Sequence, residues 1–375
     1  MRKNNLNIYL TALLLATLIF SLLTIYAFGE HHSSALSMSA SSAALYIPEN
    51  DSFVLLKDAD KRMPMASTTK IMTALVALEE CKMSEIVMVD DSAIGVEGSS
   101  AYLRQGDIVT MEELIYALLL GSANDAAVAI ACHISGSVDD FSLLMNKKAM
   151  EMGLQDTHFA NPHGLDDEEH YTTARDLAII AARALENSEF KKIASTYKKS
   201  FITEDRSRTY VNHNKLLKMY DGCIGVKTGF TKRSGRCLVS AAERDGLTFI
   251  AVTLDAPNDW SDHKKMLDFG FEAYEKRIFA ERMEKVYKVP VVDGEKDFVV
   301  VTNDEEASII TERREYTTEE HMKLIRFAVA PVKRGDILGE IVYTVDGDEV
   351  ARLKLVATEG VEKKESKGFF DKLFN

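Results

Sequence analysis

The chain has 375 residues, of which 46% are hydrophobic and 27% are charged. This composition indicates a folded protein long enough for two domains, and it excludes a largely disordered chain. The net charge of −13, without any block of lysine and arginine, argues against a nucleic-acid partner. The four cysteines (Cys81, Cys132, Cys223 and Cys237) form no C-x-x-C pair and no metal-ligand spacing with histidine. We therefore expect small buried thiols, no metal site and no Cys223–Cys237 disulfide.

Residues 1–29 predict export from the cytoplasm. Arg2 and Lys3 precede an uncharged, apolar run from Ile8 to Phe28, and small residues lie near its end. This pattern is typical of a signal peptide, and the run is also long enough to remain as an uncleaved membrane anchor. In either case the rest of the chain lies outside the cytoplasm. Residues 30–42, rich in Ser, Ala and His, predict a flexible spacer.

Residues 43–282 predict an α+β domain in which helices pack on an antiparallel sheet. The expected strands are 43–46, 53–57, 224–231, 236–244 and 247–254, and the expected helices are 71–80, 110–120, 125–134, 141–152, 174–187 and 264–276. The helix at 71–80 has almost no polar face, which predicts that it is buried. Thr110, with Glu113 three residues later, forms a capping-box pattern, and Thr172 or Thr173 is the expected cap of the helix at 174–187.

Residues 283–360 predict a small all-β domain. Its strand candidates are 286–292, 298–302, 307–311, 324–330, 337–345 and 349–357, with turns at Gly294, Gly335, Gly339 and Asp346-Gly347. In the tail, 361–375, Phe370, Leu373 and Phe374 share one helical face. This arrangement suits peripheral membrane contact through a short amphipathic helix, and a frayed tail is an equal alternative.

A serine and a lysine three residues apart, Ser67 and Lys70, begin the apolar helix. Residues at this spacing face the same side of a helix, so Lys70 can remove the proton that makes the Ser67 hydroxyl a weak nucleophile. Desolvation would shift Lys70 toward the neutral amine that such a base requires. The same spacing recurs at Ser188, Ser195 and Ser261, but only Ser67 stands at the start of a wholly apolar helix.

Two further polar motifs follow in the chain. Ser122 and Asn124 lie between two apolar helices. One interpretation is that they cap the second helix. The other is that they belong to a site, in which Ser122 relays a proton and Asn124 donates its amide to a substrate carbonyl.

The second motif, Lys227-Thr228-Gly229, lies on an expected strand, where Gly229 lets a substrate backbone approach. Lys227 and Thr228 can bind a terminal carboxylate, and the Phe230 N–H can join the Ser67 N–H in an oxyanion hole.

These three motifs, in this order, resemble the active-site set of the low-molecular-weight penicillin-binding proteins, the serine-type D-alanyl-D-alanine carboxypeptidases. The resemblance extends to the stretches 64–73, 106–114, 121–127, 159–165, 171–177 and 212–216, and so covers about 43–280; residues 283–360 are similar to the family's C-terminal domain with fewer specific residues.

The resemblance implies a penicillin-binding, transpeptidase-like catalytic domain at 43–282. The implied substrate is a peptidoglycan stem peptide ending in D-Ala-D-Ala, whose terminal D-alanine leaves as Ser67 is acylated. It also implies inhibition by β-lactams and no cofactor. The sequence leaves three alternatives open: a serine β-lactamase, a D,D-endopeptidase, and a non-catalytic wall-binding or antibiotic-sensing protein.

Overall fold

The computed structural model describes residues 36–202 and 206–365, which form two compact units, one ending at Phe271 and the next beginning at Glu272. The boundary precedes the expected one at 282, because strand β10 (Tyr274–Ala280) pairs with β13 (Ala307–Glu312) of the second unit. The predicted signal segment and the apolar face of the predicted tail helix lie outside the described residues.

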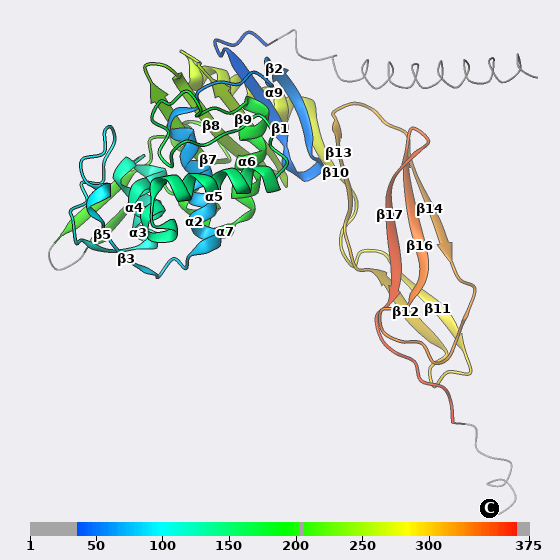
Figure 1. Ribbon diagram of the computed structural model, residues 1–375. Helices are drawn as coiled ribbons and strands as arrows, with labels where there is room; N and C mark the ends of the chain where they lie inside the picture. Colours follow the sequence, from blue (N-terminus) through cyan, green and yellow to red (C-terminus); the bar gives the residue numbers. More distant parts are fainter. Residues whose placement is uncertain (1–35, 203–205, 366–375) are drawn as a thin grey trace, which may run out of the picture. The chain divides into compact units, whose positions relative to one another are not determined.

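The first unit is built on a five-stranded antiparallel sheet in the order β2-β1-β9-β8-β7 (Figure 1). Its strands are β1 (Ser42–Ile47), β2 (Ser52–Lys57), β7 (Cys223–Thr231), β8 (Gly235–Arg244) and β9 (Leu247–Leu254). Two short hairpins, β3 (Ile86–Met88) with β4 (Ile108–Thr110) and β5 (Lys198–Ile202) with β6 (Ser207–Val211), were not expected from the sequence. The predicted α+β architecture is confirmed.

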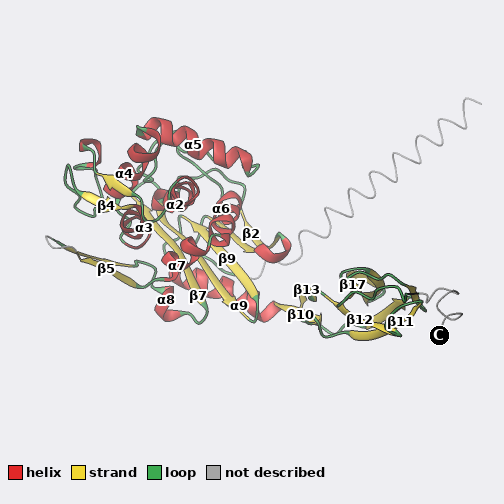
Figure 2. Ribbon diagram, turned by 90° about the horizontal axis from the view of Figure 1, so that it is seen from below, coloured by secondary structure: helices red, strands yellow, loops and turns green. Residues whose placement is uncertain are grey.

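Helices cover both faces of this sheet. The helices are α2 (Lys70–Glu80), α3 (Met111–Leu120), α4 (Asn124–Ser135), α5 (Val138–Glu151), α6 (Ala174–Glu186), α7 (Ser188–Ser195), α8 (Leu216–Met219) and α9 (Asp259–Ala273), with short 3-10 turns η1 (Pro48–Asn50), η2 (Ala66–Thr69) and η3 (Asp91–Ala93). Helix α2 contacts α3, α4, α5, α6 and α7 and is enclosed by them (Figure 2). The predicted burial of α2 is confirmed, because every residue from Lys70 to Ala77 is buried.

Side chains at alternating positions of β9 pack into different parts of the core. Ile250 and Val252 belong to the cluster that includes α2, whereas the Phe249 ring packs 4.8 Å from Phe271 of α9. His263 of α9 is fully buried and hydrogen-bonds Thr253 through Nε2 at 2.9 Å. Helix α9 begins and ends earlier than expected, because the chain after Ala273 enters strand β10.

The predicted helix caps are present. The Thr110 side chain accepts a hydrogen bond from the Glu113 N–H, and Thr173, rather than Thr172, caps α6 through the Asp176 N–H. Residues 39–41, which the sequence assigns to a flexible spacer, are bound to the sheet unit. Ser39 donates to the Asp262 carboxylate and the Ser41 N–H to the Leu254 carbonyl, so the ordered unit begins before the expected position.

The second unit is all-β, as predicted. A six-stranded sheet has the order β14-β16-β17-β12-β11-β15, with β11 (Val286–Val292), β12 (Phe298–Asn303), β14 (Thr318–Leu324), β15 (Ala328–Val329), β16 (Ile337–Val345) and β17 (Asp348–Ala357). The expected strand at 324–330 is confirmed only in part, since only Leu324, the last residue of β14, and Ala328–Val329, which form β15 and pair with β11, are in strands. The polar, exposed β14 was not expected. Gly339 lies within β16, at a bulge, and not in a turn.

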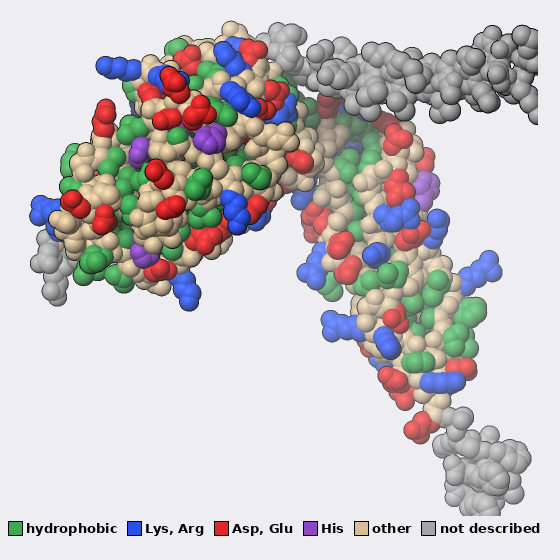
Figure 3. All heavy atoms as spheres, viewed as in Figure 1, with side chains coloured by type: hydrophobic (Ala, Val, Ile, Leu, Met, Phe, Trp, Pro, Cys, Tyr) green, Lys and Arg blue, Asp and Glu red, His purple; other side chains and the backbone are tan. Residues whose placement is uncertain are grey.

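Charged side chains of both signs are interspersed on the visible face of each unit (Figure 3). All four cysteines are free, and Cys237 pairs across the hairpin with Gly229 rather than with Cys223. Within the described residues no single helix is long and apolar enough to cross a membrane. Only α4 and α5 together meet that criterion, and they are bent by 83° at their junction.

Candidate active site

Ser67 lies in the 3-10 turn η2, which leads directly into α2. The turn contains Ala66 at φ +48°, a left-handed conformation that residues with a Cβ rarely adopt. A neighbouring loop supports it, since a Cβ on Gly164 would lie 2.0 Å from the Ala66 carbonyl oxygen. Only glycine permits this approach, so the nucleophile turn is shaped by a segment far away in the chain.

Lys70 is fully buried beside Ser67. Its Nζ lies 2.9 Å from Ser67 Oγ and 2.7 Å from Asn124 Oδ1, and it also contacts the His163 carbonyl oxygen. Burial, reinforced by the charge of Lys227, holds the pKa of Lys70 well below its usual value, while Asp125 opposes the shift. The structure therefore favours a neutral amine at this position.

The three neighbours of Lys70 also fit a neutral amine stereochemically. A neutral amine has two N–H donors and one lone pair. The Asn124 amide oxygen and the His163 carbonyl oxygen can only accept, so they take both donors. The remaining lone pair is then directed to the Ser67 hydroxyl, which is the group whose proton a base must remove.

A buried histidine fixes the next part of the nucleophile turn. His170 Nδ1 accepts from the Ala160 N–H at 3.0 Å, so in the neutral ring Nε2 carries the proton. Nε2 lies 2.7 Å from Thr69 Oγ1, which in turn donates to the Ala66 carbonyl at 2.8 Å. Burial lowers the pKa of His170 to about 4, so this chain of hydrogen bonds keeps one direction at neutral pH.

The second motif begins helix α4. Ser122 is buried at φ +58°, and Asn124 is the first residue of the helix. Besides accepting from Lys70, Asn124 donates its amide to the Glu97 carbonyl, so here the side chain positions the lysine. Its expected donation to a substrate carbonyl stays a prediction.

Asp125 attaches a loop to the start of α4. Asp125 is only 2% exposed. Its carboxylate accepts hydrogen bonds from the backbone N–H groups of Ala101 at 2.9 Å and Leu103 at 3.1 Å and from the Ser100 hydroxyl at 2.6 Å. The loop before these residues supplies Ser99 to the site. A single buried carboxylate therefore couples the second motif to one wall of the cavity.

Strand β7 presents the third motif beside Ser67. As expected, Lys227 and Gly229 lie on the same face, where a Cβ on Gly229 would lie 3.0 Å from the Ser67 nitrogen. Lys227 is only 1% exposed, and its Nζ donates to the Thr228 carbonyl at 2.8 Å. Burial lowers the pKa of Lys227 to about 7. Lys227 is therefore enclosed by protein on the face of β7 that carries Gly229, from where its charge lowers the pKa of Lys70.

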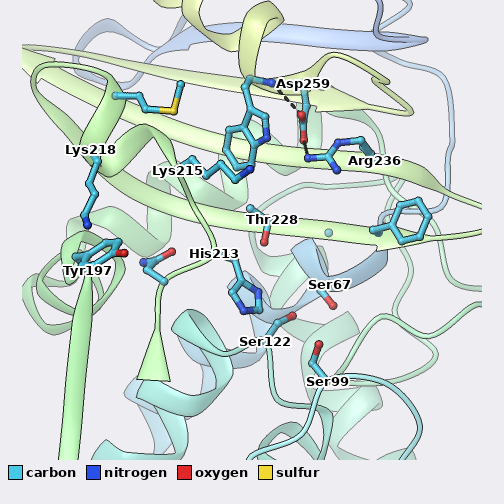
Figure 4. Close-up of a pocket in the computed structure, with 15 residues that line it drawn as sticks. Ser67, Ser99, Ser122, Tyr197, His213, Lys215, Lys218, Thr228, Arg236 and Asp259 are labelled. Atoms are coloured by element: carbon cyan, nitrogen blue, oxygen red, sulfur yellow. Dashed lines mark hydrogen bonds and ion pairs between the residues drawn. The ribbon is translucent and has the colours of Figure 1, made fainter. Parts of the chain in front are cut away.

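The three motifs meet at one cavity of about 750 Å³. The hydroxyl groups of Ser67, Ser99 and Ser122 converge at one end, and Thr228 points into the cavity from β7 (Figure 4). Gly229 and Phe230 complete the strand side. The cavity is also lined by four residues that the sequence analysis did not select, Tyr197, His213, Arg236 and Trp260, of which His213 lies close to Ser122 (Figure 4).

Arg236 is the most informative of these unexpected residues. It lies on β8 and forms an ion pair with Asp259 at 2.9 Å, yet its buried Nε has no hydrogen-bond partner among the described residues. The exposed part of the guanidinium lines the cavity and carries a permanent charge suited to bind a carboxylate. No sequence motif surrounds Arg236, since only the pairing of β7 with β8 brings it to the cavity.

The fold agrees with comparisons to known proteins. Residues 30–258 match the sequence profile of a family described as D-alanyl-D-alanine carboxypeptidase. This chain belongs to the D-alanyl-D-alanine carboxypeptidase family. Residues 274–363 match the penicillin-binding protein 5 C-terminal domain, so the second unit is also typical of such carboxypeptidases.

Individual family members cover most of the chain. The chain is 35% identical to the D-alanyl-D-alanine carboxypeptidase DacF of Bacillus subtilis, over 88% of each chain. Penicillin-binding protein 5 of Haemophilus influenzae is 29% identical, with a TM-score of 0.65 over 88% of this chain and 99% of that one. The Streptomyces K15 DD-transpeptidase is 34% identical, with a TM-score of 0.60 over 63% of this chain and 98% of its own.

Proposed function

We propose that the protein is a serine-type D,D-carboxypeptidase that removes the terminal D-alanine from peptidoglycan stem peptides. The observation that carries the proposal is the buried Lys70 amine, 2.9 Å from the Ser67 hydroxyl at the floor of the cavity. Family membership gives the substrate class, and the arrangement of the three motifs gives each residue a chemical role.

Acylation begins when Lys70 accepts the Ser67 proton. The Ser67 oxygen attacks the carbonyl between the two D-alanines, and the resulting oxyanion is stabilised by the N–H groups of Ser67 and Phe230. Ser122, beside Ser67 in the cavity, gives its hydroxyl proton to the leaving amine and takes from Lys70 the proton that came from Ser67. The bond to the terminal D-alanine then breaks, and the remaining peptide is esterified to Ser67.

Deacylation uses the same groups. Lys70, again neutral, takes a proton from water as the water attacks the ester, and Ser67 recovers its proton. A β-lactam presents a strained amide to the same hydroxyl and forms the same ester bond. Because its leaving group remains attached, the β-lactam blocks the cavity and hydrolyses slowly.

The terminal carboxylate of the substrate binds between Thr228 and Arg236. Thr228 supplies a hydroxyl, and the partly exposed Arg236 side chain supplies a permanent charge at the cavity surface. Lys227, 1% exposed on the face of β7 that carries Gly229, adds positive potential without touching the substrate. This assigns direct carboxylate contact to Arg236, whereas the sequence alone assigned it to Lys227.

The expected position of this enzyme is outside the cytoplasm, where peptidoglycan lies. The predicted signal segment at 1–29 supports export, and relatives such as DacF are named D-alanyl-D-alanine carboxypeptidases. Peripheral membrane contact, through an uncleaved N-terminal segment or through the tail at 361–375, is part of the proposal. Detergent extraction of the native protein after salt washing would distinguish an anchored chain from a released one.

The decisive experiment combines labelling with product analysis. Fluorescent penicillin should label the protein covalently, and a D-Ala-D-Ala pentapeptide should release one D-alanine per molecule. Ser67→Ala should abolish both, whereas Ser195→Ala, which alters an exposed copy of the same serine–lysine spacing at the end of α7, should retain both. Labelling of the Ser67→Ala protein would refute the assignment.

Product analysis also separates related activities. Added D-amino acid that appears in the product would indicate transpeptidation, cleavage of cross-linked dimers would indicate an endopeptidase, and rapid penicillin turnover would indicate a β-lactamase.

A further inference from the structure

The C-terminal ends of helices α2 and α4 bring together a thiol, a carboxylate and an imidazole. The ligand atoms of Cys81, Glu85 and His133 all lie within 4.8 Å of one another. Cys81 is the residue that ends α2, Glu85 follows it across a tight turn, and His133 lies in the last turn of α4. His133 Nε2 lies 2.8 Å from the Glu85 carboxylate.

We propose that these three side chains form a binding site for one zinc ion, remote from the active site. Thiolate, imidazole and carboxylate are the three ligand types that zinc takes in proteins, and three protein ligands leave a fourth position for water. Zinc–ligand bonds of about 2.0–2.3 Å at tetrahedral angles place ligand atoms about 3.3–3.6 Å apart. The present ligand atoms, all within 4.8 Å of one another, need to approach by about 1 Å to reach this geometry.

The surroundings favour a cation. The C-terminal end of a helix carries a partial negative charge from its free carbonyl groups, and the ends of both α2 and α4 lie at this cluster. Glu85 is exposed and Cys81 is partly exposed, so an ion can reach the cluster from solvent. The sequence did not predict the site, because its ligands lie far apart in the chain and match no spacing motif.

Zinc binding requires the loss of one proton and of one hydrogen bond. The Cys81 thiol releases its proton to solvent as the sulfur–zinc bond forms. The neutral His133 ring keeps one proton, on Nδ1, and coordinates through Nε2, while the ionised Glu85 carboxylate coordinates in exchange for its hydrogen bond to His133.

The position of the ion gives it a structural role. Lys70 begins α2 and Asn124 begins α4, and these residues are hydrogen-bonded at 2.7 Å. The two helices are therefore joined at their N-terminal ends by the active-site bond, and zinc would join them at the other ends. Eleven residues of α2, about 16 Å of helix, separate Lys70 from Cys81.

The test is zinc binding to the full chain after removal of metal by a chelator. Isothermal titration with zinc should give one ion per chain, and cobalt should give a thiolate-to-cobalt charge-transfer band. Cys81→Ser and His133→Asn should each weaken zinc binding at least tenfold and remove the cobalt band. Zinc at one hundred times its Kd should lower the unfolding equilibrium constant of the parent chain about a hundredfold.

Two control variants locate the ion. Cys132→Ser alters the thiol next to His133 that contacts Ser92 instead, and a double His31→Ala, His32→Ala variant removes the N-terminal histidine pair; both should bind zinc like the parent. If Cys81→Ser does not fold, Glu85→Gln supplies the same test at an exposed position. Absence of saturable binding, or binding that survives both Cys81→Ser and His133→Asn, would overturn the proposal.

Discussion

Replacing Gly164 by alanine tests whether the nucleophile turn is shaped by its neighbouring loop. The new Cβ would lie 2.0 Å from the Ala66 carbonyl oxygen and 2.4 Å from its carbon, so the turn must move by about 1 Å to restore an ordinary contact. Displacement of a reacting group by about 1 Å can cost about a hundredfold in rate. We therefore expect acylation by penicillin to slow about a hundredfold.

Gly106→Ala provides the matched control. Gly164 has φ +87° and Gly106 has φ +79°, so an alanine at either position has similar backbone strain, about 1–2 kcal/mol. A Cβ at Gly106 has nothing within 4 Å, whereas the one at Gly164 adds about 1–3 kcal/mol of overpacking. The difference between the two variants isolates the steric contact.

The assay measures the second-order rate of labelling by fluorescent penicillin, together with urea unfolding. Both variants should lose stability, the Gly164 variant by about 1–3 kcal/mol more, but only this variant should lose acylation rate. Equal labelling rates for the two folded variants would refute the view that the 161–165 loop positions Ser67.

Three further measurements follow from the site. Lys227→Met should reduce the rise of folding stability between pH 7 and 10, measured by urea unfolding. The reason is that the unfolded lysine still binds a proton in this range, whereas the folded one, with a pKa of about 7, does not. An unchanged slope of stability against pH would contradict the buried position of Lys227. Asp125→Ala should destabilise the fold by about 2–4 kcal/mol, since buried N–H groups lose their acceptor. A loss below about 1 kcal/mol would argue that Asp125 does not hold the loop to the start of α4. Arg236→Gln should raise KM for substrates with a free carboxylate far more than for amidated analogues, with Arg233→Gln, at an exposed position, as the control. Lys227→Ala should change this preference less than Arg236→Gln does. The reverse ranking would assign the carboxylate contact to Lys227.

The sequence predicted which motifs would meet in space better than which residues would support them. Ser67, Lys70, Ser122 and the β7 motif converge as expected, because short motifs on regular elements specify both spacing and face. The Gly164 loop could not be placed, since its role depends on a contact between segments far apart in the chain.

The same limit explains the errors in the fold. Strand β14 has apolar residues only at Met322 and Leu324, near its end, so its apolar alternation is too short to predict a strand, and only its pairing with β16 defines it. Arg236 was overlooked for a similar reason, because a lone arginine on a strand gives no sign of the cavity beside it. Local patterns specify elements, whereas the edges and supports of the site arise from tertiary packing.

The two buried amines have a consequence for how the enzyme responds to its surroundings. The charge of Lys227 lowers the pKa of Lys70 in a region from which dissolved ions are excluded, so changing the ionic strength should leave this influence nearly intact. The reactivity of the serine is thereby insulated from fluctuations in external salt, whereas substrate capture by the more accessible Arg236 is not.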